Sequence, residues 1–147
     1  KFSGAMMHLL GNVSYPFKML VWGLPGSGKS TFCMRLASEI GQHHPLLYIS
    51  GEESMQSATL LDKQRRALKG PAITRCTFIN RLPNSEVEWR NVLLPKTQKG
   101  VISSKAVIYD SVTMLGITPF YVQSAANEFK ASLLPLLSQI FITHAHK

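Results

Sequence analysis

Short apolar runs alternate with segments of helical periodicity along the whole chain. The apolar runs, each of which predicts a strand, lie at 17–22, 46–50, 76–80, 106–110 and 140–143. The helices predicted between them cover 30–40, 53–69, 86–94 and 124–137. This alternation is typical of a parallel β-sheet sandwiched by helices, an α/β fold with right-handed crossovers.

Within the predicted helices, apolar side chains fall on one face. Gly41 is expected to end the 30–40 helix. The inward-facing residues expected in the 53–69 helix are Leu60, Leu61 and Leu68. Ser138 and Gln139 are expected to form a short connection between the last helix and the last strand.

The composition suits a single domain over 1–147, with 1–16 as a lead-in segment. Hydrophobic residues make up 45% of the 147 residues and charged residues 16%, which favours a buried core over disorder. No apolar stretch reaches the roughly 20 residues of a membrane helix, and no secretory signal is visible. Cys33 and Cys76 are too few for a zinc ribbon or a disulfide framework, so we expect a cytoplasmic protein.

The chain carries a formal net charge of +8. A positive surplus favours polyanionic partners such as nucleotides or nucleic acid, although solubility alone explains it equally well. The basic residues of the 53–69 helix are expected to form a solvated face. Charge alone therefore decides nothing about function.

A glycine-rich segment follows the first predicted strand. It matches the phosphate-binding pattern G-x-x-x-x-G-K-[ST] through Gly23, Leu24, Pro25, Gly26, Ser27, Gly28, Lys29 and Ser30. In this motif backbone N–H groups and the start of the following helix hold nucleotide phosphates. Lys29 would reach the β- and γ-phosphates, Ser30 would supply a hydroxyl to Mg²⁺, and Thr31 would contact the α-phosphate. The segment predicts binding of ATP with Mg²⁺.

Asp110, at the end of the 106–110 run, is the candidate acid on the metal side. P-loop enzymes hold Mg²⁺ with such an acid directly or through water. The alternative is an aspartate that only opens a turn. Ser111 follows it, where many hydrolytic P-loop motors carry a glutamate, so the water-activating carboxylate is expected elsewhere.

Glu52 and Glu53 follow the 46–50 run and are the candidates for that carboxylate. Ligands of open parallel sheets bind beyond the carboxyl ends of the strands, so this pair should face the phosphates. Glu52 is favoured as the base that deprotonates water, with Glu53 as the alternative. Both could instead interact with the positive end of the following helix.

His144 lies at the tip of the last predicted strand. A polar residue there could sense the γ-phosphate, and the alternative is an ordinary exposed histidine. His144 and His146 are spaced i, i+2 without a third ligand nearby, so no zinc site is expected.

Four segments together resemble the RecA-like ATPases, and among them the RadA (Sms) branch. They are GLPGSGKST at 23–31, LLYISGEES at 46–54, VIYDSVTML at 107–115 and FITHAHK at 141–147. Their order and rough spacing fit over most of the chain, and YISGEES is the most specific part. The N-terminal zinc ribbon, the KNRFG-type motif and the C-terminal protease-like domain of that branch are not among the 147 residues. The resemblance thus covers a truncated core.

The resemblance implies roles for individual residues. Glu52 would be the catalytic glutamate, Asp110 the metal-side acid, His144 the sensor, and Lys147 a trans finger toward a neighbouring subunit. It also implies single-stranded DNA binding near 114–124 and assembly into a ring or filament. The implied strand order is third, second, fourth, fifth, first, which leaves the phosphate-loop strand near an edge that another segment or chain should cover.

The leading hypothesis is a Mg²⁺-dependent ATPase core that couples ATP hydrolysis to DNA recombination, repair or other DNA handling. The alternative is a P-loop nucleotide or small-molecule kinase, in which Arg65, Arg66 and Arg75 could serve a lid over the acceptor. A third hypothesis is a nucleotide-gated interaction module without significant turnover.

Overall fold

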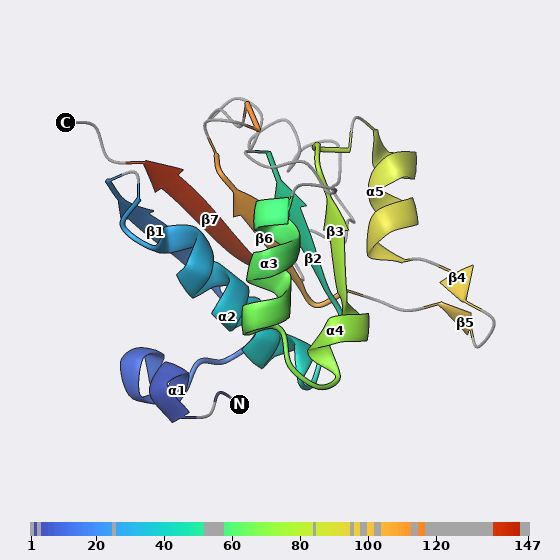
Figure 1. Ribbon diagram of the computed structural model, residues 1–147. Coiled ribbons are helices and arrows are strands. Elements are labelled where there is room, and N and C mark those ends of the chain that lie inside the picture. Colours follow the sequence, from blue (N-terminus) through green and yellow to red (C-terminus); the bar gives the residue numbers. More distant parts are fainter. Residues whose placement is uncertain are drawn as a thin grey trace.

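A five-stranded sheet, parallel throughout, forms the centre of the molecule (Figure 1). The computed structural model describes residues 2, 4–24, 26–51, 58–83, 85–94, 96–97, 100–101, 104–112, 115–116 and 137–144. The sheet strands are β1 (Lys18–Gly23), β2 (Leu46–Ser50), β3 (Cys76–Ile79), β6 (Ala106–Asp110) and β7 (Ser138–His144). A separate antiparallel pair consists of β4 (Lys96–Thr97) and β5 (Gly100–Val101). The chain has the predicted α/β fold.

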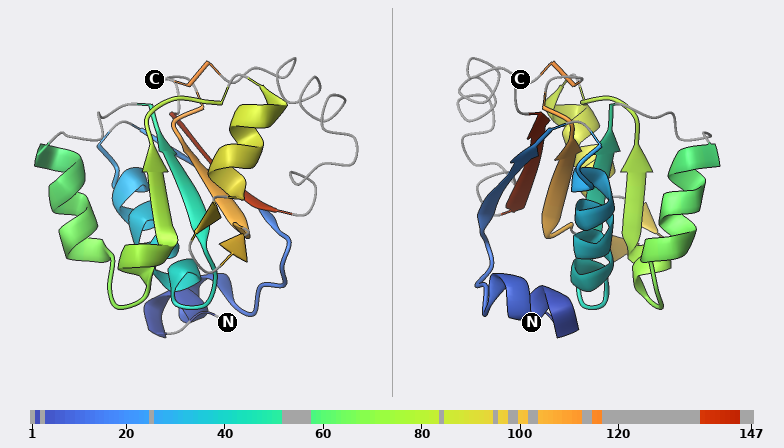
Figure 2. Two further views of the ribbon diagram at one scale, coloured as in Figure 1. Left: turned by 90° about the vertical axis from the view of Figure 1, so that its right-hand side faces the viewer. Right: turned by 60° about the vertical axis from the view of Figure 1, so that its left-hand side comes forward.

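Helices flank the sheet on both faces (Figure 2). They are α1 (Gly4–Leu10), α2 (Lys29–Gly41), α3 (Ala58–Ala67), α4 (Ala72–Arg75) and α5 (Glu86–Leu93). The apolar side of α2 packs with Tyr48 and Ile108 in one buried cluster, while α5 packs with Leu47 and Tyr109 in another. Within the described ranges, none of these helices has the length and apolar character required to cross a membrane.

Gly41 is the last residue of α2, as expected, and it packs so closely against α4 that an added Cβ would lie 2.6 Å from the Ala72 Cβ. Two details of the prediction are wrong. Leu61 is 40% exposed rather than inward. Ser138 and Gln139 belong to β7, where the buried Ser138 hydroxyl accepts a hydrogen bond from the Phe17 N–H at 3.0 Å.

The other predicted helices and strands either agree with the structure or lie outside the described residues. The strands over 46–50 and 106–110 have the predicted bounds, and the remaining strands and the 30–40 helix differ by no more than a few residues at their ends. Residues 53–57 of the second predicted helix and 124–136 of the last one lie outside the described residues.

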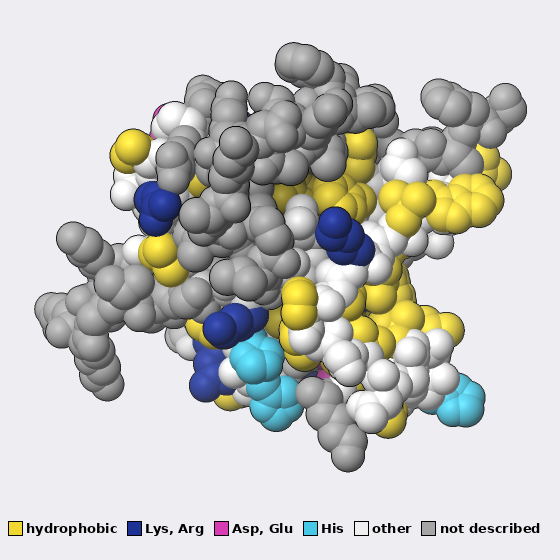
Figure 3. Space-filling model, turned by 180° about the vertical axis from the view of Figure 1, so that it is seen from behind, with side chains coloured by type: hydrophobic (Ala, Val, Ile, Leu, Met, Phe, Trp, Pro, Cys, Tyr) yellow, Lys and Arg dark blue, Asp and Glu magenta, His cyan; other side chains and the backbone are white. Residues whose placement is uncertain are grey.

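The strand order is β1-β7-β6-β2-β3. It agrees with the expected order of third, second, fourth, fifth and first, and it does not by itself identify a family. β1 stands at the edge and, in the part of the chain that is described, pairs with β7 alone. Leu20 and Trp22 of this strand are 60% and 69% exposed. Figure 3 shows hydrophobic side chains along this side of the molecule.

Candidate functional site

Four strands bring their carboxyl ends to the same edge of the sheet. Gly23, the last residue of β1, lies opposite His144 in β7, and Asp110, the last residue of β6, lies opposite Ile142 in β7 and Ser50 in β2. Ligands of open parallel sheets bind at this edge. The predicted phosphate loop and the predicted metal-side acid therefore lie at the same end of the sheet.

The glycine-rich loop turns tightly between β1 and α2. Gly26 and Gly28 have φ angles of 79° and 91°, in the left-handed region that residues with a Cβ rarely adopt. The loop also folds back over Gly23, where an added Cβ would lie 2.8 Å from the Ser27 Oγ. Gly28 is the N-cap of α2 and has no side chain that could satisfy the first N–H groups of the helix. Those N–H groups and the helix dipole favour an anion at this place.

Lys29 is folded into the loop rather than extended into solvent. Its side chain is buried, and its ammonium donates hydrogen bonds to the carbonyl oxygens of Gly23 at 2.9 Å and Leu24 at 2.8 Å. An ammonium has three donors, so this arrangement holds a positive charge at the loop with one donor to spare. Thr31 follows in the first turn of α2 and is exposed. Pro25 lies outside the described residues.

The structure brings together the two residues predicted to serve a metal ion. The Ser30 hydroxyl donates a hydrogen bond to Oδ2 of Asp110 at 3.0 Å, and the Asp110 side chain is buried. β1 and β6 are not neighbours, so α2 makes this contact by passing over the face of the sheet with its first turn above the end of β6. Hydroxyl and carboxylate oxygens are the kind of ligand that Mg²⁺ prefers, and the pair fits that ion chemically.

Tyr48, which the sequence analysis did not identify as a site residue, also contacts Asp110. The Tyr48 hydroxyl donates to the same Oδ2 of Asp110 at 2.7 Å. Burial, and after it the charge of Asp110, raises the pKa of Tyr48 well above its ordinary value, so its hydroxyl keeps the proton that it donates. The signal that could have identified Tyr48 is its hydroxyl between the apolar residues 46–47 and 49 of a strand predicted to be buried, because buried hydroxyls need hydrogen-bond partners.

The glutamate segment begins beside Asp110. The Gly51 N–H donates to the Asp110 backbone carbonyl at 2.6 Å, and an added Cβ at Gly51 would lie 2.7 Å from Cδ2 of Leu115. Glu52 and Glu53 themselves lie outside the described residues, and so does Lys147. The backbone of His144 ends β7 beside Gly23, while the placement of its side chain is not described. Of the predicted DNA-binding residues 114–124, the description covers only 115 and 116.

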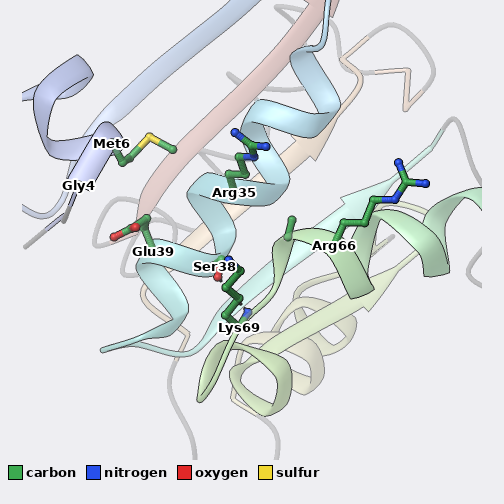
Figure 4. A pocket seen from close by; sticks show the side chains of 8 residues that line it. Gly4, Met6, Arg35, Ser38, Glu39, Arg66 and Lys69 are labelled. Atoms are coloured by element: carbon green, nitrogen blue, oxygen red, sulfur yellow. Dashed lines mark hydrogen bonds between the residues drawn. The ribbon is translucent and has the colours of Figure 1, made fainter.

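A cavity of about 430 Å³ lies away from the loop, between α1, α2 and α3 (Figure 4). Its lining residues are Gly4, Met6, Arg35, Ser38, Glu39, Arg66, Ala67 and Lys69. The positive charge there is partly offset, because Arg66 pairs with Asp62 at 2.9 Å and Glu39 contributes a carboxylate. None of the described residues of the glycine-rich loop lines this cavity.

Comparison with known proteins assigns no family. No protein-family model matches the chain, and no curated protein matches it.

Proposed function

We propose that this chain is the core of a Mg²⁺-dependent ATPase that binds ATP at 23–31. The observation that carries the proposal is the hydrogen bond between Ser30 and Asp110, because it joins the phosphate loop to a buried carboxylate at the carboxyl end of a parallel strand. Lys29, held in the loop by two carbonyl oxygens, adds the positive charge that nucleotide phosphates require.

The proposed chemistry is in-line attack of water on the γ-phosphorus. The loop N–H groups and Lys29 would bind the phosphates and stabilise the charge that develops on them. Mg²⁺, when bound, would neutralise phosphate charge, with Ser30 and Asp110 on its protein side. Glu52 would accept a proton from the water as its oxygen bonds to phosphorus. The bond from the γ-phosphorus to the bridging oxygen would break, and ADP and phosphate would leave.

We further propose, on the RadA-like sequence segments, that hydrolysis serves DNA recombination, repair or other DNA handling. In that proposal single-stranded DNA binds near 114–124, His144 senses the γ-phosphate, and Lys147 reaches a neighbouring subunit in a ring or filament. The support is the position of the described ends of these segments, since Leu115 lies against Gly51 and His144 lies beside Gly23.

The kinase alternative receives less support. Arg75, one of the arginines considered for an acceptor lid, donates hydrogen bonds to the carbonyl oxygens of Gly41 and Gln42. These atoms lie at the end of α2 opposite the phosphate loop. Arg66 is paired with Asp62 on α3. The partners of these two guanidinium groups are therefore not among the described residues of the loop.

Phosphate release from Mg²⁺-ATP by the purified chain tests the proposal. We expect release without any acceptor, and stimulation when single-stranded DNA is added. The Lys29→Ala variant, which should bind no nucleotide, serves as the blank for contaminating ATPases. Transfer of phosphate only to an added acceptor would replace the ATPase by a kinase, and binding without turnover would replace it by a nucleotide-gated module. Absence of nucleotide binding would overturn all three.

A further inference from the structure

Tyr48 lies on the same face of the sheet as the phosphate loop and α2. It stands opposite Ile108 in the neighbouring strand β6, two residues before Asp110. Side chains alternate across a strand, so Tyr48, Ile108 and Asp110 all extend toward the α2 side. Its ring spans the rise of two strand residues, about 6.6 Å, and brings its hydroxyl under the carboxylate.

Among the described residues, the hydroxyls of Ser30 and Tyr48 both donate to Oδ2 of Asp110, and that of Tyr48 makes the shorter hydrogen bond. Its distance is 2.7 Å, which is typical of a hydroxyl bound to a charged carboxylate, while the distance from Ser30 is 3.0 Å. Tyr48 is also fully buried and in contact with Phe78, with 5.2 Å between the ring centres. Its hydroxyl is therefore fixed by packing, whereas Ser30 lies in the first turn of a helix beside the loop.

We propose that Tyr48 is a positioning residue that holds the Asp110 carboxylate in the orientation it needs to serve Mg²⁺ together with Ser30. This inference rests on the proposed function. In it, Ser30 is shared between Asp110 and the ion, while the Tyr48 hydrogen bond keeps Oδ2 in place throughout. Tyr48 would touch neither nucleotide nor metal, and it would act only through Asp110.

The test compares ATP affinity with and without Mg²⁺ in Tyr48→Phe, measured by calorimetry on the full chain in Mg²⁺ or in EDTA. The variant keeps the ring and removes the hydroxyl. We expect metal-free affinity within about twofold of the wild type, and a gain in affinity from Mg²⁺ that is smaller by about tenfold, as for a lost hydrogen bond to a charged group. A purely structural role would lower both affinities alike or neither, and either result would overturn the inference.

Tyr109→Phe is the matched control. Tyr109 is also buried, it precedes Asp110 directly, and its hydroxyl donates to Oε1 of Gln139 at 3.3 Å on the other face of the sheet. Mg²⁺ should increase the ATP affinity of Tyr109→Phe as much as it increases that of the wild type. If wild-type protein itself binds no ATP, the proposed function fails, which is distinct from a failure of Tyr48 alone.

A second measurement does not depend on the folding of Tyr48→Phe. The chain has four tyrosines, so labelling with 3-fluorotyrosine gives four ¹⁹F signals, and phenylalanine replacements of the other three assign that of Tyr48. Because Mg²⁺ would draw negative charge from the Asp110 carboxylate that Tyr48 donates to, we expect the Tyr48 signal to shift when Mg²⁺ is added to the ATP complex, although the hydrogen bond itself persists. An unchanged signal would overturn the inference.

Discussion

The Ser30 hydroxyl donates a hydrogen bond to the Asp110 carboxylate at 3.0 Å, although 80 positions of sequence separate the two residues and β7 lies between β6 and β1, the strand that leads into α2. The contact links the start of α2 to the end of β6. Either residue alone is unremarkable in its local sequence, since a serine begins many helices and an aspartate ends many strands. Their contact at the carboxyl edge of the sheet is what favours a shared role.

We expect Ser30→Ala and Asp110→Asn to act on the same step. Each should reduce the affinity for Mg²⁺-ATP by about tenfold or more, because each removes one group of a charged hydrogen-bonded pair. The double variant should bind about as weakly as the weaker single variant, since residues in direct contact are not additive. Calorimetric titrations of the four proteins measure this. Ser38→Ala is the control, because Ser38 lies on the same helix and its hydroxyl accepts from the Lys69 N–H. Additive losses would contradict the shared role.

Replacement of Lys29 should abolish nucleotide binding. Lys29→Ala removes the ammonium that the loop carbonyl oxygens hold at the proposed phosphate site, and we expect affinity to fall at least a hundredfold. Binding of a fluorescent ATP analogue measures the loss. Lys18→Ala removes an exposed lysine at the opposite end of β1 and should bind normally. Equal binding by both variants would exclude the loop as the phosphate site.

Glu52→Gln should separate binding from turnover. The amide keeps the size of the side chain but cannot accept a proton, so ATP affinity should stay near the wild-type value while turnover falls by about a hundredfold or more. Single-turnover phosphate release measures the rate. Glu53→Gln is the companion variant and should retain activity. The reverse result would assign the base to Glu53, and wild-type rates in both would exclude the pair.

Gly41→Ala should destabilise the fold despite the better helix propensity of alanine. The new methyl group would lie 2.6 Å from Cβ and 2.8 Å from Cα of Ala72, so α4 has to move. Overpacking of this kind costs about 1–3 kcal/mol, against a propensity gain of about 1 kcal/mol. Urea unfolding measures the difference. Adding Ala72→Gly should recover part of the loss, and a more stable single variant would show that the two helices can separate without cost.

The two cysteines should be unreactive in the folded protein. Burial raises the pKa of Cys33 and of Cys76 to about 12, with Asp110 adding to the effect at Cys33. Ellman's reagent at pH 8 should label neither thiol before unfolding and both after it. Because the folded pKa values exceed the ordinary 9.0, unfolding releases protons above that pH. The free energy of unfolding should therefore fall as pH rises from 9 toward 12, and less so in a Cys33→Ala, Cys76→Ala variant.

The sequence predicted the strands well where burial on both faces makes a continuous apolar run. β2 and β6 are fully buried along their length, and their bounds were predicted without error. Prediction was incomplete or wrong where tertiary contacts determine the role of a residue. Gly41 ends α2 as expected, but the sequence did not show that its lack of a side chain allows close contact with Ala72. Ser138 was predicted to lie in a connection because serine is common there, but it lies in β7 and its hydroxyl accepts a hydrogen bond from the Phe17 N–H.

The candidate site could be predicted in its local parts but not in its contacts. The glycine-rich loop is contiguous in sequence, so its pattern could be recognised directly. The hydrogen bond between Ser30 and Asp110 could not be predicted, because it depends on how α2 crosses the face of the sheet, and no local sequence pattern contains that information. Tyr48 was missed because an aromatic residue in an apolar run indicates a strand and a core position, and only the register with β6 reveals its hydroxyl contact.

The position of β7 has a mechanical consequence. This strand is hydrogen-bonded to β1 along one side and to β6 along the other. Its carboxyl end cannot slide past the loop without breaking one ladder or the other. Any displacement of β7 along its own axis would therefore either carry Gly23 and the start of the glycine-rich loop with it or break the ladder to β1.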